Sequence, residues 1–168
     1  MDGFVNDIET DRRRGLRARD SDEHDEPAAA SYQEEELMAK RVLRPPNLTF
    51  LPSPEYPYSP GSTGGGLVYT AGQVAWDDNG ELVGRGDPAA QTRQVLANVM
   101  SVLREAGATP EDVLKCTVYL ADIRFFQAMN GVFSEFFPTE PPARTTVQAP
   151  LAEPEMLVEI EAIAWIGE

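Results

Sequence analysis

The apolar residues of this chain follow strand-like and helix-like spacings from about residue 47 onwards. Four segments are short, apolar and rich in β-branched or aromatic residues, which predicts strands. They are residues 67–76 (LVYTAGQVAW), 112–121 (DVLKCTVYLA), 143–149 (ARTTVQA) and 155–166 (EMLVEIEAIAWI). A turn signal at Asn79-Gly80 predicts that the chain doubles back after the first of them into another short strand.

A first helix is predicted between Asp87 and Gly107. Asp87 is a favourable N-cap residue, Pro88 suits the first helical position, and Gly107 suits the C-terminal stop. Apolar residues recur between them at helical spacing, namely Leu96, Val99, Val102, Leu103 and Ala106. The spacing indicates an amphipathic helix that packs on a core.

A second helix is predicted after Asp122, again a favourable N-cap, and prolines from Pro138 onwards end it. Its apolar stripe consists of Phe125, Phe126, Met129, Val132, Phe133, Phe136 and Phe137. Because these residues share one helical face, we interpret them as core rather than as a ligand site. The order strand, strand, helix, strand, helix, strand, strand indicates an α/β fold with two helices layered on a sheet.

The last predicted strand has two unlike faces. Val158, Ile160, Ala162 and Ala164 alternate with Glu159, Glu161, Ile163 and Trp165. The first set suits packing under helices. The second set combines carboxylates with large apolar groups, which suits a subunit interface or a partly buried cleft. In such a place a carboxylate can act as a base or orient a water molecule.

Arg144 follows a stiff Pro141-Pro142 segment, which limits the directions in which its side chain can point. Its planar fork suits bidentate capture of a carboxylate. The alternative is an ion pair across the sheet with Glu159 or Glu161 that only shapes the surface. The pattern alone leaves both interpretations open.

Residues 1–46 hold 12 acidic and 8 basic residues and little apolar periodicity, so we predict a charged, disordered N-terminal tail. A short helix over residues 31–43, ended by Pro45-Pro46, is an additional possibility. Residues 47–168 form the predicted domain, with 16 acidic and 6 basic residues, a net charge of −10 out of −14 for the chain. So acidic a domain lacks the basic surface that binds phosphate backbones, and we expect no nucleic-acid partner.

The remaining chemistry is limited. Cys116 is the only cysteine, and the only histidine, His24, lies in the tail, so neither an internal disulfide nor a Cys/His metal site is expected. No apolar run reaches the ~18 residues of a membrane span, and the N-terminus has no apolar signal core. We expect a cytoplasmic protein without a membrane partner, a metal or an organic cofactor.

Several motifs together resemble the Rid family, the reactive-intermediate (enamine/imine) deaminases of YjgF type. They are GGLVYTAGQV, QTRQVLANVMSVLREAGATPEDVLKCTVYLAD, FFQAMNGVFSEFF, PPART and LVEIEAIA, nearly collinear from about residue 56 to 166. The resemblance does not cover residues 1–46. It implies a chorismate-mutase-like α/β subunit with a mixed sheet, assembled as a homotrimer with three clefts between subunits.

The resemblance also implies roles for individual residues. Arg144 matches the arginine that holds the substrate carboxylate, and Glu159 matches the residue that positions or activates the hydrolytic water. Substrate-binding positions would be Tyr58, Ala71, Gly72, Gln73, Asn130, Thr145 and Thr146. The implied reaction converts a small carboxylate-bearing enamine or imine, such as 2-aminoacrylate, into a 2-keto acid and ammonia.

The sequence departs from the family pattern at the rim of the implied pocket. Ala71 replaces a common serine, Thr145-Thr146 replace Ser-Cys, and Pro60 replaces a glutamine. These changes concern substrate preference more than reaction class. One alternative is therefore a family hydrolase acting on a larger, aminomuconate-like catabolic intermediate. The other is a trimeric carboxylate-binding regulatory protein without turnover.

Overall fold

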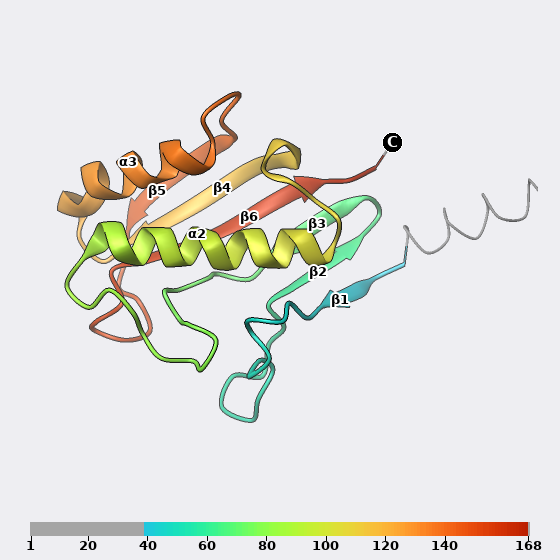
Figure 1. Ribbon diagram of the computed structural model, residues 1–168, viewed down its shortest axis with the longest axis horizontal. Helices are drawn as coiled ribbons and strands as arrows, with labels where there is room; N and C mark the ends of the chain where they lie inside the picture. The colour runs from blue at the N-terminus through green and yellow to red at the C-terminus, as the bar shows by residue number, and fades with distance from the viewer. Residues whose placement is uncertain (1–38, 168) are drawn as a thin grey trace, which may run out of the picture.

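The computed structural model describes residues 39–167, which form a single sheet with two helices on one face (Figure 1). The strands are β1 (Arg41–Leu43), β2 (Gly61–Gly64), β3 (Leu67–Thr70), β4 (Val113–Leu120), β5 (Ala143–Gln148) and β6 (Val158–Trp165). The helices are α2 (Pro88–Glu105) and α3 (Phe126–Phe136), and the 3-10 turns η1 (Pro110–Asp112) and η2 (Ile123–Phe125) precede β4 and α3. The predicted α/β class and the layer of two helices are confirmed.

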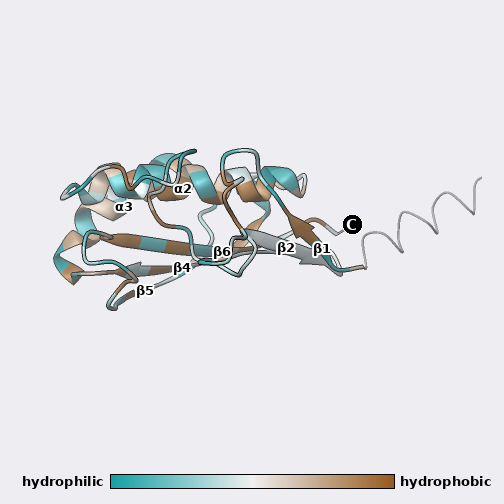
Figure 2. Ribbon diagram, turned by 90° about the horizontal axis from the view of Figure 1, so that it is seen from below, coloured by the Kyte–Doolittle hydropathy of each residue, from teal (hydrophilic) through white to brown (hydrophobic). Residues whose placement is uncertain are grey.

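The strands lie in the order β1-β2-β3-β6-β4-β5. All neighbours are antiparallel except β4 and β5, which run parallel. Parallel neighbours require a crossover connection, and α3 forms it beside α2. In Figure 2 both helices lie above the sheet, and within residues 39–167 no helix covers the lower face. The sheet therefore has a helix-covered face and an open face.

Helix α2 begins and ends where the sequence predicts. The Asp87 carboxylate accepts hydrogen bonds from the backbone N–H groups of Ala89 (2.9 Å) and Ala90 (3.0 Å), which satisfies donors that the first helical turn leaves free. Gly107, at φ +81°, follows the C-cap residue and takes the left-handed conformation that suits glycine. The predicted stripe from Leu96 to Leu103 is buried against the sheet.

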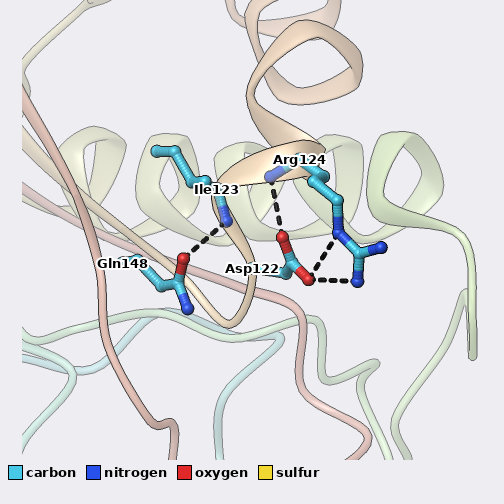
Figure 3. A network of polar contacts seen from close by, with 4 residues as sticks. All are labelled: Asp122, Ile123, Arg124 and Gln148. Atoms are coloured by element: carbon cyan, nitrogen blue, oxygen red, sulfur yellow. Dashed lines mark hydrogen bonds and ion pairs between the residues drawn. The ribbon is translucent and has the colours of Figure 1, made fainter.

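The start of α3 differs from the prediction. Asp122 caps η2 rather than α3, because its carboxylate accepts from the Arg124 N–H at 2.8 Å (Figure 3). The η2 turn leads directly into α3, which starts at Phe126. The Ile123 N–H donates to the Gln148 side chain at 3.1 Å, which joins this turn to the end of β5. The prediction that Asp122 caps the second helix is therefore wrong, because Asp122 caps the short turn η2 and α3 begins after it.

The first predicted strand is too long. Regular pairing ends at Thr70, and Gln73 and Trp76 make only isolated bridges, to Ile160 and Leu82 respectively. The predicted turn is confirmed by Gly80 at φ +78°, but the strand expected after it is reduced to the Leu82 bridge.

The edge strand β1 and its neighbour β2 were not predicted. Residues 41–43 lie inside the predicted tail, at the end of the possible helix over 31–43, yet they pair with β2 as β1. The ordered domain therefore starts before the boundary at residue 47. Three residues are too few to show a recognisable alternation of apolar and polar positions. The remainder of the predicted tail, residues 1–38, lies outside the described residues.

Replacing Leu43 by alanine should lower the free energy of unfolding by about 2–4 kcal/mol, because its side chain is completely buried in the core. Arg41→Ala, at an exposed position of the same strand, is the matched control and should change it by less than about 0.5 kcal/mol. Urea unfolding of the full chain measures both. Equal midpoints for the two variants would contradict the assignment of β1 to the core sheet.

Candidate functional site

Arg144 on β5 is held in place by α3. Its Nη2 donates to Asn130 Oδ1 at 2.8 Å, and its Nη1 lies 3.9 Å from Met129 Sδ. Its guanidinium carbon is 4.6 Å from the ring centre of Phe133 and 5.6 Å from that of Phe126, distances at which cations are attracted to aromatic rings. Among the described residues no carboxylate lies within ion-pair distance of Arg144. The guanidinium is thus oriented, and part of its donor fork remains available to an anion.

Glu159 on β6 lies against Gly72 and near Tyr58. A Cβ atom at position 72 would overlap the Glu159 carboxylate, so the absence of a side chain at Gly72 lets the carboxylate occupy this position. Burial, and then the charge of Glu161, raises the pKa of Glu159. Burial and the charge of Glu159 likewise raise the pKa of Tyr58. Three of the predicted site residues, Tyr58, Gly72 and Glu159, therefore lie together.

Arg144 and Glu159 lie on opposite faces of the sheet. Strand β4 separates β5 from β6, and its Cys116 pairs with Arg144 on one side and with Ala162 on the other. Paired residues share a face, and Cys116 and Ala162 are buried under the helices. Glu159 is an odd number of positions from Ala162 along β6, so it belongs to the open face.

This arrangement overturns one interpretation of the sequence. The ion-pair interpretation requires the strand of Arg144 to lie next to the strand of Glu159 and Glu161. In the structure β4 lies between these two strands, and Arg144 is on the opposite face of the sheet from both glutamates. Within one subunit the arginine and the glutamate therefore form two separate half-sites, one with Asn130 and one with Tyr58.

Gln73 and Ala71 flank Gly72, the residue that lies against Glu159. The Gln73 side chain is buried and donates to the carbonyls of Pro60 (3.2 Å) and Ala71 (3.1 Å). Its backbone N–H and C=O both pair with Ile160, at 2.9 and 3.0 Å. Gln73 therefore positions the loop, with its polar groups already engaged, and Ala71 stands half-buried beside Gly72.

The two threonines after Arg144 point to different faces. Thr145 pairs with Thr117 on the open face, and its hydroxyl accepts from Lys115 Nζ at 2.5 Å. Thr146 pairs with Val118 and so shares the helix-covered face with Arg144. Of the two, only Thr146 lies on the same face of the sheet as Arg144.

The surroundings of Glu161 and Cys116 agree with structural roles rather than catalytic ones. Glu161 accepts a hydrogen bond from the Tyr119 hydroxyl at 3.3 Å on the open face. Burial raises the pKa of the Cys116 thiol to about 12, although the charges of Arg144 and Lys115 act against that rise. Cys116 is therefore a neutral, unreactive thiol at physiological pH.

The sequence did not indicate that Phe126 and Phe133 contact the arginine. Their helical spacing was interpreted as core packing, which Phe133 confirms, but the same rings also flank Arg144. An apolar stripe contains no signal for this, because the contact depends on where β5 lies. No cluster of three or more His, Cys, Asp or Glu side chains suited to a metal ion occurs in residues 39–167.

The sequence model of the family described as Endoribonuclease L-PSP matches residues 50–166, which include both half-sites. A solved Rid-family protein of unknown function from Yersinia pestis, YyfA, is 36% identical over 76% of this chain and 100% of its own, with a TM-score of 0.69. The chain belongs to the Rid family.

Other Rid-family structures agree. Rv2704 of Mycobacterium tuberculosis, from the YjgF/YER057c/UK114 family, is 30% identical over 76% of this chain and 100% of its own, with a TM-score of 0.65. Escherichia coli TdcF, solved with bound serine, is 30% identical over 76% and 99%, with a TM-score of 0.67. The resemblance found in the sequence is thus confirmed. No helix within residues 39–167 is long and apolar enough to cross a membrane.

Proposed function

We propose that this Rid-family protein hydrolyses small enamine or imine intermediates that carry a carboxylate, such as 2-aminoacrylate, to a 2-keto acid and ammonia. The observation that carries the proposal is that the guanidinium of Arg144 is held in a fixed orientation without an ion-pair partner among the described residues. Asn130 and two phenylalanine rings orient its guanidinium, and no carboxylate of the described chain neutralises it. A buttressed, unpaired fork suits capture of a substrate carboxylate. TdcF, with its bound serine, supports a ligand of amino-acid size.

The opposite placement of Arg144 and Glu159 supports a site between subunits. Neither residue can reach the other through its own sheet, so one substrate can meet both only where two copies of the chain adjoin. The open face also exposes Tyr69, Val147 and Trp165, and exposed apolar side chains of this kind mark an association surface. We therefore propose a homotrimer in which each cleft combines Arg144 of one subunit with Glu159 of its neighbour.

The reaction needs little from the protein beyond positioning. The enamine CH2=C(NH2)–COO⁻ tautomerises to the imine CH3–C(=NH)–COO⁻, whose C2 is electrophilic. Arg144 holds the carboxylate, and Glu159 orients a water molecule, takes one of its protons and lets its oxygen bond to C2. The proton taken by Glu159 passes to the imine nitrogen, which gives the carbinolamine. The hydroxyl of the carbinolamine then loses its proton as the C=O bond forms, and the C–N bond breaks as the nitrogen takes up a proton and leaves as ammonia. One water is consumed, and pyruvate and one ammonia are formed.

The proposal is tested by generating 2-aminoacrylate and other imines enzymatically and measuring ammonia and keto-acid release with and without the protein. We expect faster release with at least one carboxylate-bearing imine. A preference for aminomuconate-like substrates would favour the larger-substrate alternative. Keto-acid binding without acceleration of any imine would favour the carboxylate-binding alternative.

The assembly proposal gives a separate expectation. Light scattering coupled to size exclusion should give about three times the 18.5 kDa subunit mass. Trp165→Glu places a charge on the exposed apolar part of the open face and should shift the protein towards monomers and abolish turnover together. A wild-type monomer would contradict the shared cleft. Arg93→Glu, on an exposed side of α2, should leave the mass unchanged.

A further inference from the structure

A pocket separate from the proposed deamination site lies among three loops. It has a volume of about 400 Å³, and the connections β1–β2, β3–α2 and β5–β6 supply its walls. It contains none of the residues of the proposed deamination site. Its lining combines aromatic rings with carboxylate side chains.

Three aromatic rings gather in this pocket. The ring centres of Phe50 and Trp76 are 5.6 Å apart with planes at 76°, and those of Tyr56 and Trp76 are 5.2 Å apart with planes at 57°. Rings that meet at such steep angles form a corner rather than a parallel stack. Trp76 is buried in the core, whereas Phe50 and Tyr56 are half-buried and leave part of their rings to a ligand. Ring faces attract organic cations because they carry negative charge density.

Carboxylates surround the aromatic corner. Glu55, Glu81 and Glu153 line the pocket and are exposed. Both Glu55 and Glu153 line the same pocket as Tyr56, and burial, and then the charges of these two carboxylates, raises the pKa of Tyr56. The one basic residue of the lining, Arg85, forms an ion pair with Glu155 outside it, which leaves the three lining carboxylates uncompensated.

The spacing of these carboxylates disfavours a metal ion as the ligand. Within residues 39–167 no three acidic, histidine or cysteine side chains come together as a metal site requires. A bare ion needs converging oxygens, whereas an organic cation spreads its charge and contacts aromatic faces and separated carboxylates at once. We propose that this pocket binds an organic cation, an alkylammonium or guanidinium group, independently of the deamination site.

The test is calorimetric titration of the full-length chain with choline and with 3,3-dimethyl-1-butanol, a neutral molecule of the same shape. We expect saturable binding of choline, and binding of the neutral analogue at least about ten-fold weaker. Choline binding should also weaken as sodium chloride rises, because exposed carboxylates are screened. Equal binding of the two molecules, or no saturable choline binding at millimolar concentrations, would overturn the proposal.

Variants locate the site. Glu81→Gln and Glu153→Gln change exposed side chains and should each weaken choline binding by about two- to five-fold. Tyr56→Leu should weaken it further, with an unfolding midpoint confirming that the variant is folded. Glu111→Gln, exposed on η1 and absent from the lining, is the matched control and should change nothing. Equal losses in Glu111→Gln and the pocket variants would overturn the assignment.

Discussion

Arg144→Ala should lower kcat/KM for 2-aminoacrylate by roughly thirty-fold to several thousand-fold, because losing one side of a charge-assisted contact costs about 2–5 kcal/mol. Arg144→Lys keeps the charge but loses the planar fork and its stacking between Phe126 and Phe133. It should therefore recover only part of the loss. Initial rates of ammonia release over a range of substrate concentrations measure both variants.

Arg93 provides the matched control for this prediction. Its guanidinium also makes two hydrogen bonds to a carboxylate, that of Glu135, but both side chains are exposed on the outer side of the helices. An exposed pair of this kind contributes at most about 1 kcal/mol to stability, so Arg93→Ala should leave kcat/KM nearly unchanged. If Arg144→Ala turns over every tested imine as fast as the parent, Arg144 has no part in catalysis.

Local patterns predicted much of this fold. The alternation in β6 identified the face with Glu159 and Glu161, and Asp87 and Gly107 marked the ends of α2. These features follow from backbone geometry within a few residues, so a single sequence carries them. The alternation alone left two interpretations of Arg144 open, capture of a carboxylate or an ion pair across the sheet. The resemblance to the Rid family added the interpretation of Arg144 and Glu159 as a functional pair.

The features that the sequence did not predict depend on contacts distant in the chain. Which face of the sheet Arg144 occupies is fixed by the pairing of β5 with β4 and of β4 with β6, more than ten residues away in each case. The residues that flank its guanidinium come from α3, which is placed by the same crossover. Strand β1 is short and follows a charged run, so only its partner β2 identifies it. Pairing of this kind has no local periodicity.

Glu159→Gln should lower kcat by about a hundred-fold or more, the range in which general bases contribute, while a keto acid such as pyruvate binds nearly as before. The amide keeps the shape of the side chain beside Gly72 and removes its ability to take a proton. Binding should persist because the proposed anchor, Arg144, is unchanged. Loss of pyruvate binding together with turnover would instead show a disturbed site.

The pH dependence of kcat/KM separates the role of Glu159 from that of its neighbour. Glu159 acts as a base only when ionised, so activity should fall as pH drops through its pKa, which burial and Glu161 raise above the ordinary glutamate value. Glu161→Gln removes one of these causes and still offers an oxygen to the Tyr119 hydroxyl. The acidic limb should therefore move to lower pH, with the plateau kept. Glu111→Gln, far along the chain on exposed η1, should not move it. If the acidic limb of the pH profile lies at the same pH in Glu161→Gln as in the parent, the limb reports the ionisation of a group other than Glu159.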